Sequence, residues 1–262
     1  MRPALFSAKN IVKNFPGAPE PALNGASLDI IEGECLVISG ANGSGKTLLM
    51  KIISGLAPPD KGEALFMGRP MLDAKGRIFP AVEKQIRREL GIVFQDADAQ
   101  IVGQTVAEDA AFGPECLGYG ESEAAERARA ALAALGMEKM GERDPRRLSG
   151  GEKRRLAVAG AVASGCRALI LDEPFANLDW PGVKSVIEMI GALKSEGKTL
   201  AILTHELEKI IHIADRLAIL YKGRVCSEGA PRDVLDALRP EWGVRDPRRP
   251  WDFAAGELCA QG

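Results

Sequence analysis

With 262 residues, 46% of them hydrophobic, the chain is long enough for one large or two small domains with a sizeable core. Its 34 basic and 36 acidic residues leave a net charge of −2, which argues against nucleic acid as a main partner because a polyanion selects a basic surface. The five cysteines form no CxxC pair, the first residues are too short an apolar stretch for a signal peptide, and no apolar run reaches the length of a membrane span, so we expect a cytoplasmic protein that meets a membrane only through a partner.

The first residues carry strand signals, and a helix signal follows them. Residues 1 to about 33 show weak apolar–polar alternation and Pro-Gly turns, which favours an antiparallel β region. The apolar run from Glu34 to Ser39 predicts a buried parallel strand. A glycine-rich loop comes next and leads into a helix that begins near Lys46 and should end before Gly55.

The glycine-rich loop matches the pattern G-x-x-x-x-G-K-[ST], which binds phosphate. Glycines let successive backbone N–H groups point at phosphate oxygens, and the helix N-terminus adds a partial positive charge. Lys46 is expected to reach the β- and γ-phosphates of a nucleotide, and Thr47 to offer its hydroxyl to Mg²⁺. A glycine-rich turn with a surface lysine is the simpler alternative, but the flanking strand and helix are as the pattern requires. The predicted ATP-binding residues are Gly40, Ala41, Asn42, Gly43, Ser44, Gly45, Lys46 and Thr47.

The middle of the chain changes from strand signals to helix signals. Short strands and a basic helix near Val82 to Arg88 come first. The stretch from Glu121 to Leu135 is rich in alanine and carries charges at helical spacing. We expect a helical subdomain over about 96–160, whose charged face is either a contact surface or simply solvated.

A second phosphate clamp is indicated at the end of this subdomain. Ser149 and Glu152 form a capping box before an apolar helix. Gly150 and Gly151 are poor helix formers, so their place in the first turn suggests a close approach to the backbone, and a helix N-terminus with a serine hydroxyl suits a γ-phosphate. A well-capped helix without a ligand is the alternative. Because one subunit cannot apply both clamps to one nucleotide, the pair predicts an ATPase that works as a dimer.

Two further apolar strands end in polar residues. The strand from Arg167 to Asp172 continues into Glu173, and the strand from Thr199 to Thr204 into His205. The carboxyl ends of parallel strands share one edge of a sheet, where ligands bind. Alone, an Asp-Glu pair would be read as a solvated turn and a histidine as structural, so the prediction depends on all three strand ends together.

The glycine-rich loop together with the stretch from Leu148 to Glu152 resembles ABC-type ATPases. The resemblance covers about residues 4–237 and leaves 238–262 as a tail that we expect to be loosely ordered. It implies an α/β fold, namely a P-loop NTPase core with a mostly parallel sheet, an N-terminal antiparallel β region and an inserted helical subdomain. It also implies that ATP and Mg²⁺ are the cofactors. The residues expected to close on the nucleotide of a second subunit are Leu148, Ser149, Gly150, Gly151 and Glu152.

The resemblance assigns roles to the polar strand ends. Asp172 would hold Mg²⁺ together with Thr47 and Gln95, and Gln95 would also sense the transport partner. Glu173 would be the general base that polarises the attacking water. His205 would contact the γ-phosphate and orient that water.

Two further positions match the family pattern, and one departs from it. Asp179 matches the loop that links the two active sites across the dimer, and Phe15 matches the aromatic residue that stacks on adenine, although Phe15 could instead be a core residue. Phe175 stands where a small hydroxyl residue is usual. His212 falls in a helical apolar pattern and is expected to pack.

Past Gln95 the resemblance is to the ATPases of energy-coupling factor importers, which serve cobalt, nickel and vitamins. It rests on Phe94 to Gln100, Thr105-Val106, and Asp109 to Glu115. It implies a transmembrane coupling protein and a small substrate-binding membrane protein as partners, at the cytoplasmic face of the cell membrane. Homodimer and heterodimer with a second ABC ATPase remain equally open, and a soluble ABC-type ATPase for cofactor or cluster assembly is the alternative function.

Overall fold

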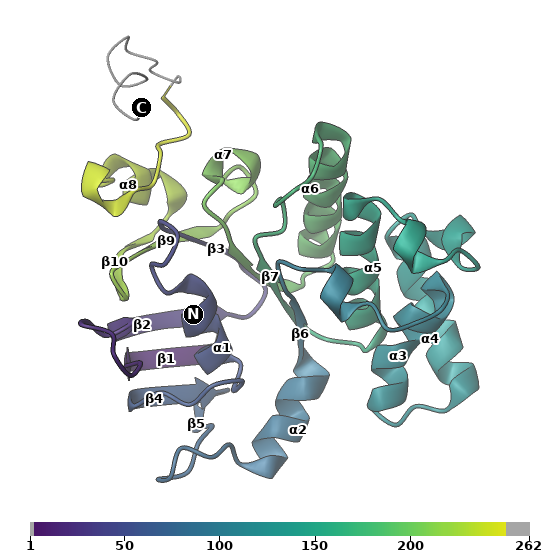
Figure 1. The fold of residues 1–262 in the computed structure, drawn as a ribbon, viewed down its shortest axis with the longest axis horizontal. Coiled ribbons are helices and arrows are strands. Elements are labelled where there is room, and N and C mark those ends of the chain that lie inside the picture. Colours follow the sequence, from purple (N-terminus) through teal and green to yellow (C-terminus); the bar gives the residue numbers. More distant parts are fainter. Residues whose placement is uncertain (1–2, 250–262) are drawn as a thin grey trace.

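Two β-sheets and a group of helices make up this computed structural model, which describes residues 3–249 (Figure 1). The first sheet is antiparallel with the strand order β2-β1-β4-β5. Phe6 of β1 and Phe66 of β4 pair across it with ring centroids 5.1 Å apart, and both are buried. The antiparallel region predicted at the N-terminus is therefore confirmed. The strands are β1 (Ala4–Lys13), β2 (Leu23–Ile31), β4 (Lys61–Phe66) and β5 (Arg69–Pro70).

The second sheet is mostly parallel and has the order β10-β9-β3-β8-β7-β6. Only β10, at one edge, runs antiparallel to its neighbour. Every residue of β3, β7 and β8 is buried, which is why these strands read as continuous apolar runs. Their polar ends therefore meet at one edge, as predicted. The strands are β3 (Cys35–Ser39), β6 (Leu90–Val93), β7 (Ala168–Asp172), β8 (Thr199–Leu203), β9 (Arg216–Tyr221) and β10 (Arg224–Gly229).

The parallel sheet is the middle layer of the molecule (Figure 1). Leu36 and Ile38 of β3 pack toward α1 and the antiparallel sheet, whereas Cys35 and Val37 pack on the opposite side with residues of α5 and α6. Alternate residues of one strand thus serve two separate cores. The helices outside the helical subdomain are α1 (Lys46–Ile53), α2 (Pro80–Glu89), α6 (Trp180–Ser195), α7 (Leu207–Ile210) and α8 (Pro231–Asp236).

Three helices form the expected helical subdomain beside the sheet (Figure 1). Thr105 caps α3 and Ser149 caps α5, each in a complete capping box. Within the described residues, no helix is both long and apolar enough to pass through a bilayer. The longer helices of the subdomain are α3 (Val106–Cys116), α4 (Glu121–Ala134) and α5 (Gly150–Ala163), and the short 3-10 turns of the chain are η1 (Asp98–Gln100), η2 (Glu138–Met140), η3 (Pro145–Arg147) and η4 (Pro240–Trp242).

Two expectations need correction. His212 does not pack in a helix, because α7 ends at Ile210 and His212 is exposed. Loose order was expected from residue 238 onward, but in the described part of that tail Trp242 and Val244 are buried in the core that contains β9. A Cβ on Gly243 would lie only 3.1 Å from Ala41, so this segment rests against the glycine-rich loop. Residues 250–262 lie outside the described part of the chain.

The reactivity of the cysteine thiols tests whether β3 and the residues around Cys166 are buried as the structure shows. Burial raises the pKa of Cys35 to about 12 and that of Cys166 to about 11, whereas Cys116 and Cys226 are exposed. Because the thiolate is the reactive form, we expect iodoacetamide to modify Cys116 and Cys226 in the native protein and to reach the other two only after denaturation. Peptide mass mapping gives the rates. Equal native rates at Cys35 and Cys226 would contradict the burial of β3.

Candidate functional site

The loop between β3 and α1 approaches the neighbouring backbone closely. A Cβ on Gly40 would lie 2.1 Å from the carbonyl oxygen of Leu220 in β9, so no larger residue fits without moving the strand. Gly43 and Gly45 have φ values of +78° and +104°, which side chains rarely tolerate. The loop can therefore turn tightly around a small anion, as the pattern predicts.

Lys46 begins α1 and is almost completely buried. Its ammonium donates hydrogen bonds to the carbonyl oxygens of Gly40 at 2.7 Å and Ala41 at 3.3 Å, and lies 3.9 Å from Oε1 of Glu173. Burial lowers the pKa of Lys46 below its ordinary value, although Glu173 and Asp172 oppose this effect. The structure thus holds a cation at the mouth of the loop, where phosphate groups would meet it.

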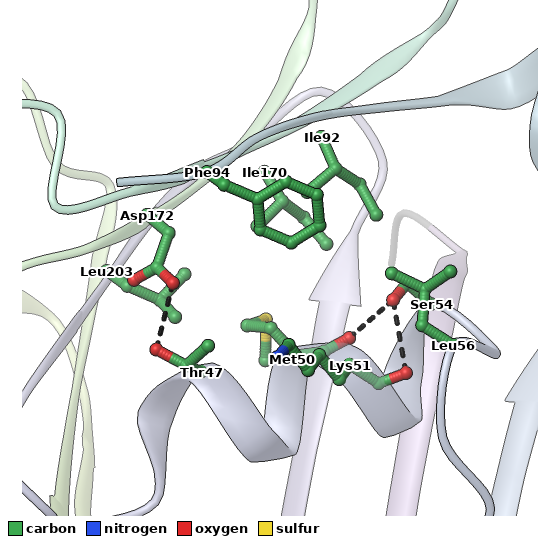
Figure 2. Close-up of a pocket in the computed structure, with 10 residues that line it drawn as sticks. All are labelled: Thr47, Met50, Lys51, Ser54, Leu56, Ile92, Phe94, Ile170, Asp172 and Leu203. Carbon is green, nitrogen blue, oxygen red and sulfur yellow. Dashed lines mark hydrogen bonds between the residues drawn. The ribbon is translucent and has the colours of Figure 1, made fainter. Parts of the chain in front are cut away.

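Thr47 and Asp172 join the glycine-rich loop to the end of β7. The Thr47 hydroxyl donates to Oδ2 of Asp172 at 2.9 Å (Figure 2). The other carboxylate oxygen, Oδ1, is buried without a hydrogen-bond partner, and burial raises the pKa of Asp172 while the Thr47 bond lowers it. A hydroxyl next to a carboxylate oxygen with unused lone pairs is a donor set that suits a hard cation such as Mg²⁺.

Glu173 and His205 meet beside this pair. Nδ1 of His205 lies 3.0 Å from Oε2 of Glu173. The Glu173 carboxylate is buried, whereas the His205 side chain is half exposed. Glu173 has φ +46°, which is unusual for a residue with a side chain, and its N–H is held by the carbonyl oxygen of Leu203 in β8. The neighbouring strand thus fixes a strained backbone that turns the carboxylate toward the cleft.

A cleft of about 410 Å³ brings several of the predicted residues together, but Gly40, Ala41 and Asp172 are not part of its lining. Gln95 reaches it from the segment after β6, and Glu173 and His205 from the ends of β7 and β8. Ala22 and Leu48 also line the cleft, and neither carries a sequence signal. The loop residues in the lining are Asn42, Gly43, Ser44, Gly45, Lys46 and Thr47.

The predicted second clamp lies elsewhere. Within residues 3–249, the lining of this cleft includes none of the five residues from Leu148 to Glu152. The Ser149 hydroxyl accepts from the Glu152 N–H at 3.3 Å, and the Glu152 carboxylate accepts from the Ser149 N–H at 2.7 Å, so the predicted capping box is present. Gly150 instead lines a neighbouring cleft of about 560 Å³, beside Asn177, and Gln95 is the one described residue that lines both clefts.

The two glycines of the second clamp also have a packing role that the sequence did not reveal. A Cβ on Gly150 would lie 2.9 Å from Leu178, and one on Gly151 would lie 3.0 Å from the Cα of Gly182. The first turn of α5 therefore rests against the start of α6. Asp179 caps α6 by accepting the Gly182 N–H at 3.0 Å.

Phe15 lies apart from the cleft lining, just after β1. Its side chain is 49% exposed, which rules out the alternative that it is a core residue. Asp60 anchors the preceding residues, because it accepts from the Lys13 ammonium at 2.8 Å and from the Asn14 N–H at 2.7 Å. The aromatic ring is accordingly presented on a fixed backbone, and its contact with adenine stays a prediction.

Arg154, a residue that contacts the segment carrying Gln95, was not identified from the sequence. Arg154 in α5 is only 3% exposed and donates to the carbonyl oxygens of Phe94 and Gln95. The signal in the sequence is its spacing, since it lies three residues after Gly151 and four before Val158 on the buried stripe of the helix.

Comparisons with known proteins identify the family of this chain. Residues 23–176 match the family described as ABC transporter. The energy-coupling factor transporter ATP-binding protein EcfA2 of Methanospirillum hungatei is 38% identical over 88% of this chain, which spans 56% of that relative. The cobalt import ATP-binding protein CbiO of Rhodobacter capsulatus is 40% identical over 93% of this chain and 85% of its own length.

A solved structure supports the fold independently. CbiO1 from Clostridium perfringens, described as part of the ABC transporter complex cbiONQ, superposes with a TM-score of 0.80 at 31% identity and covers 92% of this chain and 93% of its own. The overall fold of this chain is therefore the fold of that protein. The chain belongs to the ABC transporter family and is one of its ATPases.

Proposed function

We propose that this chain is the ATP-hydrolysing subunit of an energy-coupling factor importer that carries a transition-metal ion or a vitamin. The observation that carries the proposal is the cleft in which the phosphate-binding loop meets Gln95, Glu173 and His205. The relatives named for energy-coupling factor transport and cobalt import, together with the structural likeness to CbiO1, support this type of importer.

The residues in and around the cleft would have different roles in ATP binding and hydrolysis. The N–H groups of the loop and the ammonium of Lys46 would bind the phosphates, while Phe15 stacks on adenine. Thr47, Asp172 and Gln95 would hold Mg²⁺, which neutralises charge on the phosphates when bound. Glu173 accepts the proton of the attacking water, and His205, bonded to Glu173 at 3.0 Å, orients that water against the γ-phosphate.

A second subunit completes each site. Because Leu148 to Glu152 lie outside the lining of the cleft, their clamp serves the nucleotide of a partner, either a second copy or a related ABC ATPase. Asp179 would lie near the junction between the two sites. ATP then supplies contacts from both subunits and favours the closed dimer, and hydrolysis removes them.

Closure would drive a membrane partner. We place the chain at the cytoplasmic face of the membrane, bound to a transmembrane coupling protein, with a small membrane protein that binds the substrate. A soluble role in cofactor or cluster assembly is the competing function, and it would require soluble partners only.

The substitution Glu173→Gln tests the base. We expect ATP hydrolysis to fall by about 10²- to 10⁴-fold because the proton acceptor is lost, while ATP affinity stays similar and an ATP-bound dimer accumulates. Steady-state phosphate release and light scattering after size exclusion measure the two effects. Glu188→Gln, on the exposed face of α6, is the matched control. Hydrolysis at the control rate would remove Glu173 from the role of base.

The second clamp is tested by placing Ser149→Arg in the Glu173→Gln background. A bulky cation at the start of α5 should block the partner's nucleotide, so we expect dimer formation with ATP to be lost. Because Ser149 does not line its own subunit's cleft, the ATP affinity of the monomer should be unchanged. Ser195→Arg, exposed at the end of α6, is the control. A fall in monomer affinity with dimerisation intact would place the clamp in its own subunit's site.

Partners are tested by affinity purification of the tagged chain from native membranes solubilised in detergent. We expect a multispanning protein and a small membrane protein to copurify, and the small protein to point to the substrate. Recovery of soluble partners alone would contradict the importer and favour the assembly ATPase.

A further inference from the structure

Arg154 is a buried cation with no carboxylate partner within ion-pair distance among the described residues. Its side chain lies in the first turns of α5, shortly after the clamp residues, and is only 3% exposed. The guanidinium makes its hydrogen bonds to backbone carbonyl oxygens, and its Nε is buried without a partner. Burying a guanidinium costs free energy. If Arg154 served only to fill this space, a methionine or leucine would be more favourable there.

The carbonyl groups that Arg154 reaches belong to two loops of the candidate site. Nη1 donates to the oxygen of Phe94 at 3.1 Å and of Gln95 at 2.9 Å. Nη2 donates to the oxygen of Ala176 at 3.5 Å, three residues after Glu173. One side chain thus ties the clamp helix to the segment that carries Gln95 and to the loop that follows the base.

The bonded segment also shapes the surroundings of Asp172. The ring of Phe94 lines a narrow pocket together with Thr47 and Asp172 (Figure 2). The carbonyl of the same residue accepts from Arg154, so a change in the guanidinium would move the ring as well as Gln95. Phe94 thus shares a pocket with both Thr47 and Asp172, and Gln95 shares the cleft with Thr47.

A second cation on the same helix turn holds the far end of this segment. The ammonium of Lys153 forms an ion pair with Asp98 in η1. The pair is partly exposed and should contribute little to stability alone. With Arg154 it leaves the segment from Phe94 to Asp98 attached to α5 at both ends.

We propose that Arg154 is a positioning residue that couples the placement of Gln95 at the Mg²⁺ site to the position of the clamp helix. The inference rests on the proposed role of Gln95. When the helix engages the partner's nucleotide, the guanidinium transmits that position to the backbone of Gln95. Closure on one nucleotide therefore adjusts the metal-binding set of the subunit's own cleft.

The test is a double-substitution cycle between Arg154→Lys and Gln95→Ala. Lysine keeps the charge but cannot bridge the separate carbonyl oxygens as the guanidinium does. In the otherwise unchanged chain we expect kcat to fall about tenfold and the Mg²⁺ concentration for half-maximal ATPase activity to rise, with little change in KM for ATP. In the Glu173→Gln background, the Mg²⁺ concentration for half-maximal binding of a fluorescent ATP analogue, measured without turnover, should rise as well. In the Gln95→Ala background the same substitution should have almost no further effect.

Arg155→Lys is the matched control. Arg155 lies on the same helix and donates to the carbonyl of Leu135 at 3.4 Å, inside the helical subdomain and away from Gln95. We expect this variant to keep the Mg²⁺ dependence of the unchanged chain, even if Tm falls. If Arg154→Lys does not fold, Arg154→Met, which keeps the volume and removes the buried charge, replaces it in the cycle.

The outcomes separate the two proposals. If Gln95→Ala slows hydrolysis but Arg154→Lys has its full effect in both backgrounds, Arg154 does not act through Gln95 and the inference fails alone. The inference also fails if Arg154→Lys lowers only Tm. If Gln95→Ala leaves hydrolysis and the Mg²⁺ dependence unchanged, the proposed role of Gln95 fails and the inference fails with it.

Discussion

The hydrogen bond from Thr47 to Asp172 is the contact on which the site depends. It joins the first turn of α1 to the end of β7, and the two bonded residues are 125 positions apart in the chain. The bond occupies one carboxylate oxygen and leaves the other buried without a partner. Since a buried carboxylate is unfavourable without compensation, this position is favourable only if a cation or further donors complete it. The bond therefore fixes the position of the glycine-rich loop relative to the end of β7, which carries Asp172.

The parts of the fold that were predictable are those whose reasons are local or periodic. β3, β7 and β8 read as unbroken apolar runs because both faces of the parallel sheet are covered, and the capping box of α5 follows from Ser149 and Glu152, three residues apart. Parallel pairing then brings the polar ends of β3, β7 and β8 to one edge of the sheet, so a cleft at that edge followed from the sequence.

The remaining features depend on contacts between distant segments. The spacing of Arg154 along α5 predicts that it is buried, but its hydrogen-bond partners depend on the segment after β6 and the loop after Glu173. Gly150 and Gly151 suggested a ligand, but Leu178 and Gly182 also require small residues there. Trp242 lies in a segment rich in proline and arginine whose local composition favours loose order, and only β9 and the core around it provide the surface that buries it. No periodicity within a single segment records such contacts.

The charges of the cleft explain why nucleotide binding and subunit closure should be linked. Glu173 lines the cleft with one ammonium, that of Lys46, and with the half-exposed His205. Asp172 adds a second carboxylate next to it, bonded to Thr47 of the cleft lining. The phosphates of ATP add further negative charge, so the occupied cleft has an excess that Lys46 alone cannot balance. Mg²⁺ at Thr47 and Asp172 would reduce this excess from within the subunit, and the positive end of α5 from a partner would reduce it from outside. We therefore propose that loss of the γ-phosphate would lower the attraction for the partner helix and let the dimer open.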